Sequence, residues 1–168
     1  DLEHCTQRGG TPLADVLGYA ATQSPDHDGL GATAEDIAAA MTLALDSAGI
    51  DSSGVDAIVP FGCGIPTIDA AEAEAIRTVF GDRASDIELV LTVPFTGNCN
   101  AGNGTIQLAV ACRCLQTQSL PARLNTGTLA GDLKAGPCDA RATALRTVLV
   151  VSASQGGQNT AVLLGRHE

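Results

Sequence analysis

Two glycine-rich turns carry the side chains of this chain that could do chemistry. The first turn lies in Val59-Pro-Phe-Gly-Cys-Gly64, and the second lies in Thr96-Gly-Asn-Cys-Asn-Ala-Gly-Asn-Gly104. Cys63 and Cys99 are the candidate nucleophiles, because a cysteine thiolate can form covalent intermediates. Cys99 comes at or just before the start of a predicted helix, where the helix dipole favours the thiolate. Chemistry at these turns would therefore begin with a thiol.

Neither turn contains a general acid or base. The histidines are His4, His27 and His167; two lie near the ends of the chain and one lies in a polar loop. The first acid after the first turn is Asp69. Because general acid–base catalysis needs a positioned His, Glu, Asp or Lys, a Cys-His or Ser-His-Asp arrangement has no base within this chain. The alternative for both thiols is burial as small apolar side chains.

The cysteine spacing argues against a metal site and against a disulfide framework. The chain contains no CxxC pair, whereas zinc sites commonly use such pairs. We therefore expect no metal and no cofactor. Free thiols of this kind fit a reducing cytoplasm. The six cysteines are Cys5, Cys63, Cys99, Cys112, Cys114 and Cys138.

Composition narrows the class of protein. The chain has 168 residues, of which 45% are hydrophobic and only 2% are aromatic, which suits helices packed closely on a sheet. The net charge of −10 argues against binding to nucleic acid or to an anionic membrane, since both need a basic surface. The sequence shows no signal peptide and no apolar run of about 18 residues. Because it opens on Asp-Leu-Glu-His without Met, we expect a fragment, a processed product or one half of something larger.

Periodicity predicts an α/β fold with the order βαβαβαββ and a single domain over residues 1–168. The five apolar runs typical of buried strands and the three patterns typical of amphipathic helices alternate until the last two strands, which form a hairpin. Right-handed crossovers would bring the three strand-to-helix turns to one rim of the sheet. The expected strands are 12–21, 55–59, 87–93, 148–152 and 160–164; the expected helices are 33–48, 69–80 and 101–117, and 119–144 is expected to be irregular.

Capping residues predict where two of these helices begin. Thr33 precedes Ala-Glu-Asp and fits an N-cap. Asp69 fits the N-cap of the next helix, and Glu72 at the third helical position resembles a capping box. Both acids are therefore expected to serve the start of that helix.

The two glycine-rich turns, a third one at Ala153-Ser-Gln-Gly-Gly-Gln-Asn159 between the last two expected strands, and their flanks resemble the C-terminal half of a β-ketoacyl synthase of the thiolase superfamily. The resemblance is closest to KAS II-type condensing enzymes and to the chain-length factors that accompany them in aromatic polyketide systems. It rests on three motifs: Val16-Leu-Gly-Tyr19, Asp69-Ala-Ala-Glu-Ala-Glu-Ala-Ile followed by Val-Phe-Gly81, and Gly156-Gly-Gln-Asn159. The implied fold is one thiolase-like half, a mixed five-stranded sheet packed with helices.

The resemblance implies that the catalytic histidines of the family are missing here. Phe61 stands at the position of the first family histidine, Asn98 at that of the second, and Val93 at that of the family lysine. Phe61 cannot donate a hydrogen bond, and Asn98 cannot shuttle a proton at neutral pH. No residue is therefore assigned a catalytic role. The candidates for an acyl pocket are Phe61, Cys63, Phe95, Thr96, Asn98, Cys99, Gln155, Gly156 and Gly157.

These departures imply a ketosynthase-like subunit that has no catalytic histidines of its own. It would pair with an active ketosynthase and shape the acyl tunnel in fatty-acid or polyketide biosynthesis, in the manner of a chain-length factor. One alternative is a piece of a split 3-oxoacyl-ACP synthase with acyltransferase activity, completed by an N-terminal half that carries the nucleophile. Another is a non-catalytic binding module. The implied partners are a ketosynthase subunit or N-terminal thiolase half and an acyl carrier protein. We expect an obligate oligomer, because the third helix would otherwise expose an apolar side.

Overall fold

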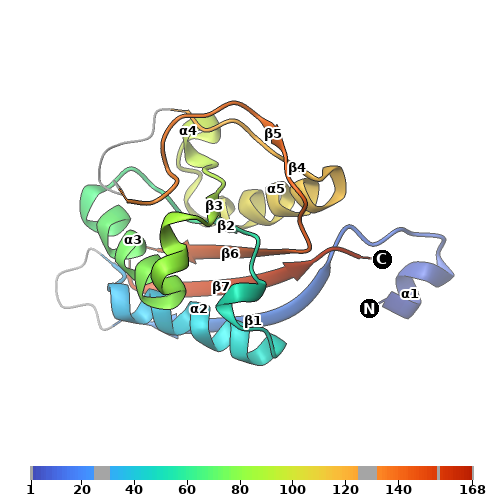
Figure 1. Ribbon diagram of the computed structural model, residues 1–168. Coiled ribbons are helices and arrows are strands. Elements are labelled where there is room, and N and C mark those ends of the chain that lie inside the picture. The colour runs from blue at the N-terminus through green and yellow to red at the C-terminus, as the bar shows by residue number, and fades with distance from the viewer. Residues whose placement is uncertain (1, 25–30, 125–131, 155, 168) are drawn as a thin grey trace.

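The computed structural model describes residues 2–24, 31–124, 132–154 and 156–167. Its core is a five-stranded mixed sheet in the order β1-β7-β6-β2-β3 (Figure 1). Strand β2 is parallel to β3 and β6, and β7 is antiparallel to β6 and β1. The sheet strands are β1 (Asp15–Gln23), β2 (Ala57–Val59), β3 (Glu88–Leu89), β6 (Thr147–Ala153) and β7 (Gln158–Gly165), and the long helices between them are α2 (Ala34–Ala48), α3 (Pro66–Phe80) and α5 (Asn103–Thr117). The predicted βαβαβαββ order is confirmed.

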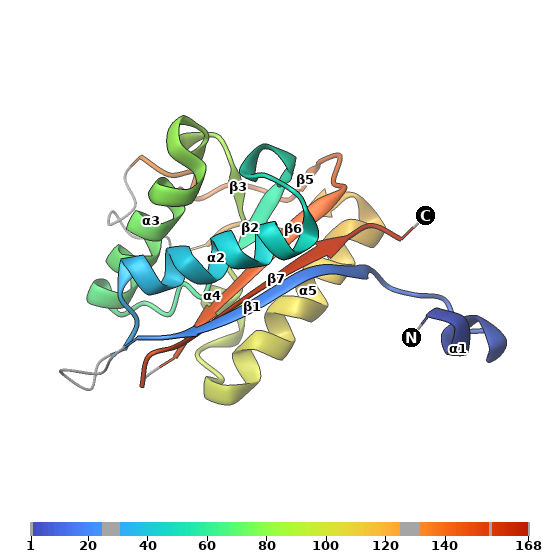
Figure 2. The ribbon, with the colours of Figure 1, turned by 90° about the horizontal axis from the view of Figure 1, so that it is seen from below.

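Helices cover both faces of the sheet. Helices α2 and α3 lie on one face and α5 lies on the other, as Figures 1 and 2 show from two directions. Ile37, Met41 and Ala44 recur at helical spacing on α2 and are completely buried in the first of these two layers. Ala111 and Leu115 of α5 are completely buried in the layer on the other face of the sheet. Because few side chains are aromatic, both cores consist mainly of small and branched aliphatic groups, with Phe61 and Phe80 in the first, and helices and sheet can approach closely.

The short elements lie at the edges of this sandwich. Helix α1 (Leu2–Gln7) buries none of its residues, and both ribbon views show it standing away from the sheet. Helix α4 (Val93–Thr96) follows β3, and the two-stranded sheet of β4 (Ser119–Leu120) and β5 (Arg141–Ala142) follows α5. Three 3₁₀ turns complete the described elements: η1 (Ser52–Gly54), η2 (Gly81–Ser85) and η3 (Asn100–Gly102). In the part of the chain that the structure describes, no helix is long and apolar enough to cross a membrane.

The contact between β1 and α2 requires a residue without a side chain at position 18. A Cβ built on Gly18 would lie 2.2 Å from the backbone oxygen of Ala44 and 2.8 Å from Ser47 Oγ. We expect Gly18→Ala to lower the free energy of unfolding by about 2 kcal/mol, the usual cost of overpacking a core. Urea denaturation measures this, and Gly136→Ala is the matched control, since its added methyl would meet nothing within 4 Å. Equal stability of the two variants would contradict the prediction.

The predicted start of α3 and its capping box are wrong. The helix begins at Pro66 after Ile65, three residues earlier than expected, because proline is favoured in the first turn of a helix. Asp69 therefore lies inside the helix, and its carboxylate accepts a hydrogen bond from the Gly64 N–H at 3.1 Å. Glu72 also bonds outside the helix, to the backbone of the preceding turn. The N-cap predicted at Thr33 is confirmed, since its side chain accepts from the Asp36 N–H.

Two other expectations about local structure need correction. The strand expected over 87–93 pairs only at Glu88–Leu89, and Val93–Thr96 forms a helical turn instead, with Pro94 in its first positions. The segment expected to be irregular contains the β4–β5 pair and a bridge between Arg123 and Cys138. Of the polar loop expected around His27, residues 25–30 lie outside the described residues.

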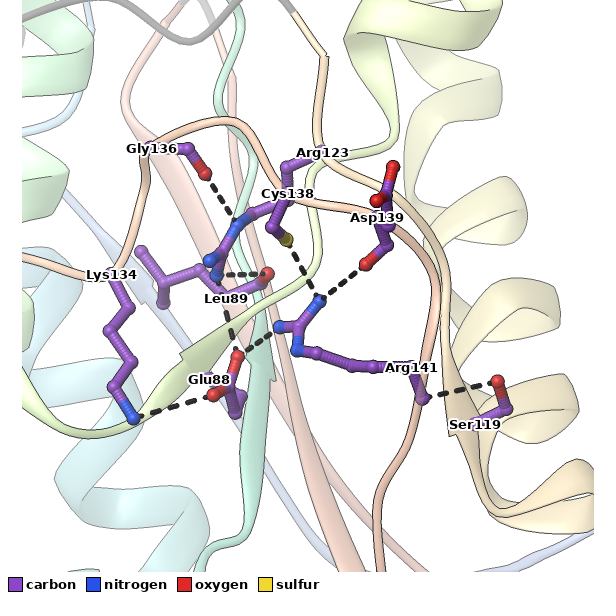
Figure 3. A network of polar contacts seen from close by, with 9 residues as sticks. All are labelled: Glu88, Leu89, Ser119, Arg123, Lys134, Gly136, Cys138, Asp139 and Arg141. Atoms are coloured by element: carbon purple, nitrogen blue, oxygen red, sulfur yellow. Dashed lines mark hydrogen bonds and ion pairs between the residues drawn. The ribbon is translucent and has the colours of Figure 1, made fainter.

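Glu88 holds this segment against the edge strand β3. Its carboxylate forms ion pairs with Arg123 at 3.4 Å, with Lys134 at 3.4 Å and with Arg141 (Figure 3). Arg123 also donates to the backbone oxygens of Gly136 and Leu89. One carboxylate thus ties β3 to three cations that come from distant parts of the segment.

Candidate functional site

A cavity of about 500 Å³ opens where three turns meet. Two of them, at Phe61 and at Asn98, lead from a strand to a helix, and the third joins β6 to β7. The cavity lies at the carboxyl ends of β2 and β6, the edge at which α/β sheets usually bind ligands. Its apolar wall includes Phe61, Ile65, Ile68, Leu108, Val150 and Val162. Its polar wall consists of Asn98, Asn100, Ser152, Ser154, Gln158 and Thr160. Among the described residues that line it, none is charged, so the polar chemistry is that of amides and hydroxyls.

Glu72 fixes the turn that presents Phe61 to this cavity. Its two carboxylate oxygens accept hydrogen bonds from the Phe61 N–H at 2.7 Å and the Gly62 N–H at 2.9 Å. The side chain is almost completely buried. Burial raises the pKa of Glu72 to about 7, although the two N–H groups of Gly62 and Phe61 act in the opposite direction. The carboxyl group therefore changes its protonation near neutral pH.

Asp69 holds the rest of the same turn. Its carboxylate accepts the Gly64 N–H and, at 3.6 Å, the thiol of Cys63. Burial is the main cause that raises the pKa of Cys63 to about 11, and the nearby Asp69 adds to it. Cys63 is a protonated thiol at neutral pH, and it does not line the cavity. The arrangement gives no support to Cys63 as a nucleophile.

The second turn fixes the orientation of the Asn98 side chain. Asn98 Oδ1 accepts hydrogen bonds from the Asn100 N–H and from Asn103 Nδ2, both at 2.8 Å. Asn103 in turn accepts the Cys99 N–H at 2.8 Å. Because a backbone N–H can only donate, the atom that it meets on Asn98 must be the oxygen. The amide NH₂ of Asn98 is therefore the end left over for other contacts.

Cys99 is exposed and points back into its own turn. Its sulfur lies 3.7 Å from the Thr96 carbonyl oxygen and 3.8 Å from that of Gly97. The 3₁₀ turn η3 begins directly after it, with Cys99 as its N-cap, and leads into helix α5 at Asn103, so the thiol lies just before a helical start as expected. Cys99 does not line the cavity, and no titratable group within hydrogen-bonding reach of its sulfur is found among the described residues.

The third turn joins β6 to β7 and packs on the end of β1. Gly157 has a φ of +80°, and a Cβ on it would lie 2.7 Å from the Ser24 backbone oxygen. Asn159 Nδ2 donates to Ser24 Oγ at 3.2 Å. Gly156 and Gly157 thus serve the turn and do not line the cavity, whereas Gln155 lies outside the described residues.

Gln107 of α5 ties the ends of the two central strands together behind the cavity. Its Nε2 donates to the Pro60 oxygen at 2.7 Å and to the Val151 oxygen at 2.8 Å. The side chain is completely buried. Because Pro60 follows β2 and Val151 lies in β6, this amide fixes the spacing of the strand ends that form the cavity floor.

The structure brings together two of the predicted pocket residues, Phe61 and Asn98. Phe95 and Thr96 are exposed, and like Cys63 and Cys99 they do not line the cavity; Val93 does not line it either. Sequence reasoning missed Ser152 and Thr160. The available signal was the alternation of inward and outward side chains along the last two strands. Ser152 is two residues from Val150 and Thr160 is two residues from Val162, so each hydroxyl is on the same face of the sheet as an apolar neighbour. In the described part of the chain, no group of three His, Cys, Asp or Glu side chains could hold a metal ion.

A mixed five-stranded sheet with helices on both faces and a ligand-sized cavity at its strand ends defines a thiolase-like half-fold. Residues 13–127 match the family described as Beta-ketoacyl synthase, C-terminal domain, and the chain belongs to this family. The predicted resemblance and fold class are confirmed.

The similar proteins include a 3-oxoacyl-[acyl-carrier-protein] synthase and subunits of polyketide synthases. The chain is 28% identical over 169 residues to 3-oxoacyl-[acyl-carrier-protein] synthase 2 of Coxiella burnetii, with 99% of this chain and 41% of that protein covered. It is 33% identical over 132 residues to the tetracenomycin polyketide synthase ketoacyl synthase beta subunit of Streptomyces glaucescens, with 77% of this chain and 32% of that subunit covered. The structure of the ishigamide ketosynthase/chain length factor superposes with a TM-score of 0.90 at 25% identity and covers 99% of this chain and 41% of that one. The chain thus spans about two fifths or less of these relatives.

Proposed function

We propose that this chain belongs to a ketosynthase-like subunit that does not catalyse condensation itself. It pairs with an active ketosynthase and shapes the acyl tunnel, as a chain-length factor does. The observation that carries this proposal is a cavity of about 500 Å³ whose described lining residues include no acid and no base. Phe61 and Asn98, which take the histidine positions of the family resemblance, both line that cavity.

The chemistry of these two side chains supports the proposal. Decarboxylative condensation needs donors that stabilise the developing charge on a thioester carbonyl, and losing one such donor typically costs about 3–4 kcal/mol. Phe61 offers no donor, and Asn98 offers a neutral one. Cys63 and Cys99 do not replace a missing nucleophile, since neither faces the cavity. Binding and shaping remain as functions for the site.

The exposed surface supports a protein partner. Val16 is 69% exposed and Tyr19 is 57% exposed on the edge strand β1. They pair with Leu164 and Val162, which pack in the core under α5. The apolar surface thus lies mainly on β1 beside α5. On α5 itself the exposed positions are Thr105, Ala109, Arg113, Gln116 and Thr117, and the apolar side chains of Ile106, Leu108 and Val110 are half-buried.

Restoring the histidines tests whether the site is only degenerate. We expect Phe61→His with Asn98→His to raise malonyl decarboxylation at least about 100-fold over the wild-type complex, because each imidazole would return a donor worth several kcal/mol. The measurement is release of labelled CO₂ from malonyl-acyl carrier protein by the chain in complex with a partner whose own active site has been inactivated, so that only the cavity of this chain contributes.

The matched control is the double variant Phe61→His with Asn100→His, in which Asn98 is left unchanged. Asn100 lines the same cavity but does not take a family histidine position. No gain in the Phe61→His, Asn98→His variant, with its complex intact by native mass spectrometry, would count against a degenerate ketosynthase site. A gain in the control alone would do the same.

The similarity to a 3-oxoacyl-[acyl-carrier-protein] synthase favours a second candidate. In it the chain supplies one part of an active acyltransferase whose nucleophile comes from another thiolase-like segment. Native mass spectrometry of the protein from its own source identifies the partner. Condensation by the wild-type assembly after removal of every other ketosynthase would establish this candidate over the first.

A further inference from the structure

The turn from Phe61 to Gly64 (the Phe61 turn) is held in place by two side chains of α3. Glu72 accepts the N–H groups of Phe61 and Gly62, and Asp69 accepts that of Gly64. Among the described residues, no backbone-to-backbone hydrogen bond involves this turn. Its position therefore depends on carboxyl groups, whose capacity to accept hydrogen bonds changes when they gain or lose a proton.

The chain is attached firmly on either side of the Phe61 turn. Before it, Gln107 Nε2 donates to the Pro60 oxygen at 2.7 Å. After it, the Ile65 oxygen accepts the first backbone hydrogen bond of α3, at 2.9 Å. Between these points Gly62 and Gly64 have φ angles of +50° and +81°, and glycine enters and leaves such conformations without the steric cost of a side chain. The turn can thus be released while β2 and α3 stay in place.

Glu72 lies in the interior without a counter-charge. Its side chain is 4% exposed, and burial, which disfavours the ionised form, raises its pKa to about 7. The charged group that acts on this pKa is Asp69, in the same direction. The other titratable side chain of the turn is Cys63, which bonds to Asp69. Burial and like charge together therefore oppose ionisation while the turn is held.

The other charged side chains on the elements around α3 are exposed or paired elsewhere. On α2 and in the 3₁₀ turns, the acids Glu35, Asp46, Asp51 and Asp82 are exposed. Asp36 bonds to Thr33, Arg77 pairs with Asp132, Arg83 donates to the oxygens of Ser52 and Val55, and Lys134 pairs with Glu88. Among the described residues, ionised Glu72 can therefore gain stabilisation only from the two N–H groups and from water.

Ionisation of Glu72 favours the released turn. When the turn leaves, water reaches the carboxyl group and its pKa returns to the ordinary 4.5. Between pH 4.5 and pH 7 the held turn thus binds more protons than the released turn, so a rise in pH favours release. From below pH 4.5 to above pH 7 the equilibrium between the two changes by roughly 300-fold in total, and by about tenfold between pH 6 and pH 8.

From this arrangement we propose that the Phe61 turn is a pH-sensitive gate in the cavity wall, with the Glu72 carboxyl as its switch. Phe61 lines the cavity and is 8% exposed, so release of the turn takes its ring out of the wall and opens the cavity to solvent. The protonated carboxyl keeps the gate closed, and the ionised carboxyl drives it open. This device goes beyond the subunit role proposed above and does not depend on it.

Amide hydrogen exchange at Phe61 and Gly62 measures the release directly, because these N–H groups exchange when they leave Glu72. The full chain in its native assembly is exchanged at pH 5, 6, 7 and 8, and fragmentation mass spectrometry assigns the residues. After correction for the intrinsic exchange rate, we expect the protection of both amides to fall roughly 40-fold from pH 5 to pH 7 and by less than about twofold from pH 7 to pH 8.

The amides of Val150 and Val151 in β6 report unfolding of the whole fold, since both residues are buried at the centre of the sheet. We expect them to be at least about tenfold better protected than Phe61 and Gly62 at every pH. Protection of the turn that does not change with pH would overturn the proposal. Protection equal to that of β6 would also overturn it, because the turn would then open only with the whole fold.

Variants assign the release to the named side chains. Glu72→Gln has no proton to lose, so its corrected protection should stay constant from pH 5 to pH 8. The matched control is Glu74→Gln, an exposed position of the same helix, which should keep the wild-type profile. If Glu72→Gln fails to assemble, Asp69→Asn removes the like charge and should move the levelling of the profile to lower pH. A wild-type profile in Glu72→Gln, or in Asp69→Asn, would overturn the assignment of the switch.

A third variant tests whether the ring moves with the turn. Phe61→Ala removes the apolar contact that release must break, and it should increase the exchange of the Gly62 amide at least about tenfold at pH 7. Unchanged exchange at Gly62 would show that the ring stays in the wall and would overturn the gate.

The outcome is independent of catalysis, because exchange is measured without substrate and without turnover. An assembly in which this chain takes part in condensation would sink the proposed function and leave the gate standing. Protection that is independent of pH in an inactive assembly would sink the gate alone.

Discussion

Glu72→Gln is expected to remove most of the pH dependence of stability between pH 5 and pH 8. In the folded chain Glu72 keeps its proton up to a pKa of about 7, against an ordinary value of 4.5 in the unfolded chain. Folding therefore binds a proton in this range, and the free energy of unfolding of the wild type falls as the pH rises. The stabilisation is complete below pH 4.5 and is lost above pH 7, a difference of about 3 kcal/mol.

Burial is the physical cause, because Glu72 faces no cation among the described residues. Its partners are two backbone N–H groups, and the charged group that contributes to its pKa is the carboxylate of Asp69, which disfavours ionisation further. Glutamine keeps one acceptor oxygen for the Phe61 turn and loses the other, at a cost of about 1–2 kcal/mol relative to the wild type with Glu72 ionised. The stability difference between wild type and variant is thus largest at pH 5 and shrinks towards pH 8.

Urea denaturation at pH 5, 6, 7 and 8 measures this difference. Glu74→Gln is the control, because Glu74 lies on the same helix and its side chain is 62% exposed. A Glu72→Gln difference that stays constant from pH 5 to pH 8 would show that Glu72 is ionised throughout.

Local patterns were sufficient to predict the framework of the fold. The spacing of Ile37, Met41 and Ala44 defines the buried side of α2, and Gly49, with a φ of +66°, ends that helix as expected. It could also be predicted that the three turns meet, because parallel strands joined by right-handed crossovers all end at the same edge of the sheet. Phe61 and Asn98 could be placed at the cavity for this reason.

The details that failed depend on contacts between distant residues. Asp69 and Glu72 have the spacing of a capping box, but the turn that precedes the helix offers them free N–H groups at closer range. Leu89–Val93 has the composition of a strand, yet only its first position pairs with β2. Ser119 pairs with Ala142 across more than twenty residues, and no local pattern encodes that pairing.

The hydroxyl pair in the cavity shows the same limit. Ser152 and Thr160 each appear in the sequence as an ordinary polar residue near a strand end. Only the register of the β6–β7 hairpin, in which Ala153 faces Asn159 and Ser152 faces Thr160, brings them opposite each other. A shift of that register by one residue would turn Thr160 to the other face of the sheet.

Glu88→Gln is expected to lower the free energy of unfolding by about 2–3 kcal/mol at neutral pH. The substitution leaves Arg123, whose side chain is 8% exposed, without its carboxylate, and an uncompensated buried charge is strongly destabilising. Arg123 keeps its bonds to the Gly136 and Leu89 oxygens, and water screens Lys134 and Arg141 in part, so the loss lies at the lower end of the range for buried pairs.

The pH dependence of this network runs opposite to that of Glu72. Burial alone would raise the pKa of Glu88, but Arg141 and Lys134 outweigh it, and the net pKa lies below the ordinary 4.5. The stabilisation is thus present above pH 4.5 and is lost as the pH falls through the lowered pKa. Glu88→Gln and wild type should therefore converge in acid, whereas Glu72→Gln and wild type come closest at alkaline pH. Glu74→Gln, which removes an exposed pair, should differ from wild type by less than about 0.5 kcal/mol. If Glu88→Gln costs no more than Glu74→Gln, the segment from β4 to β5 is held to the sheet by its backbone pairing and not by these charges.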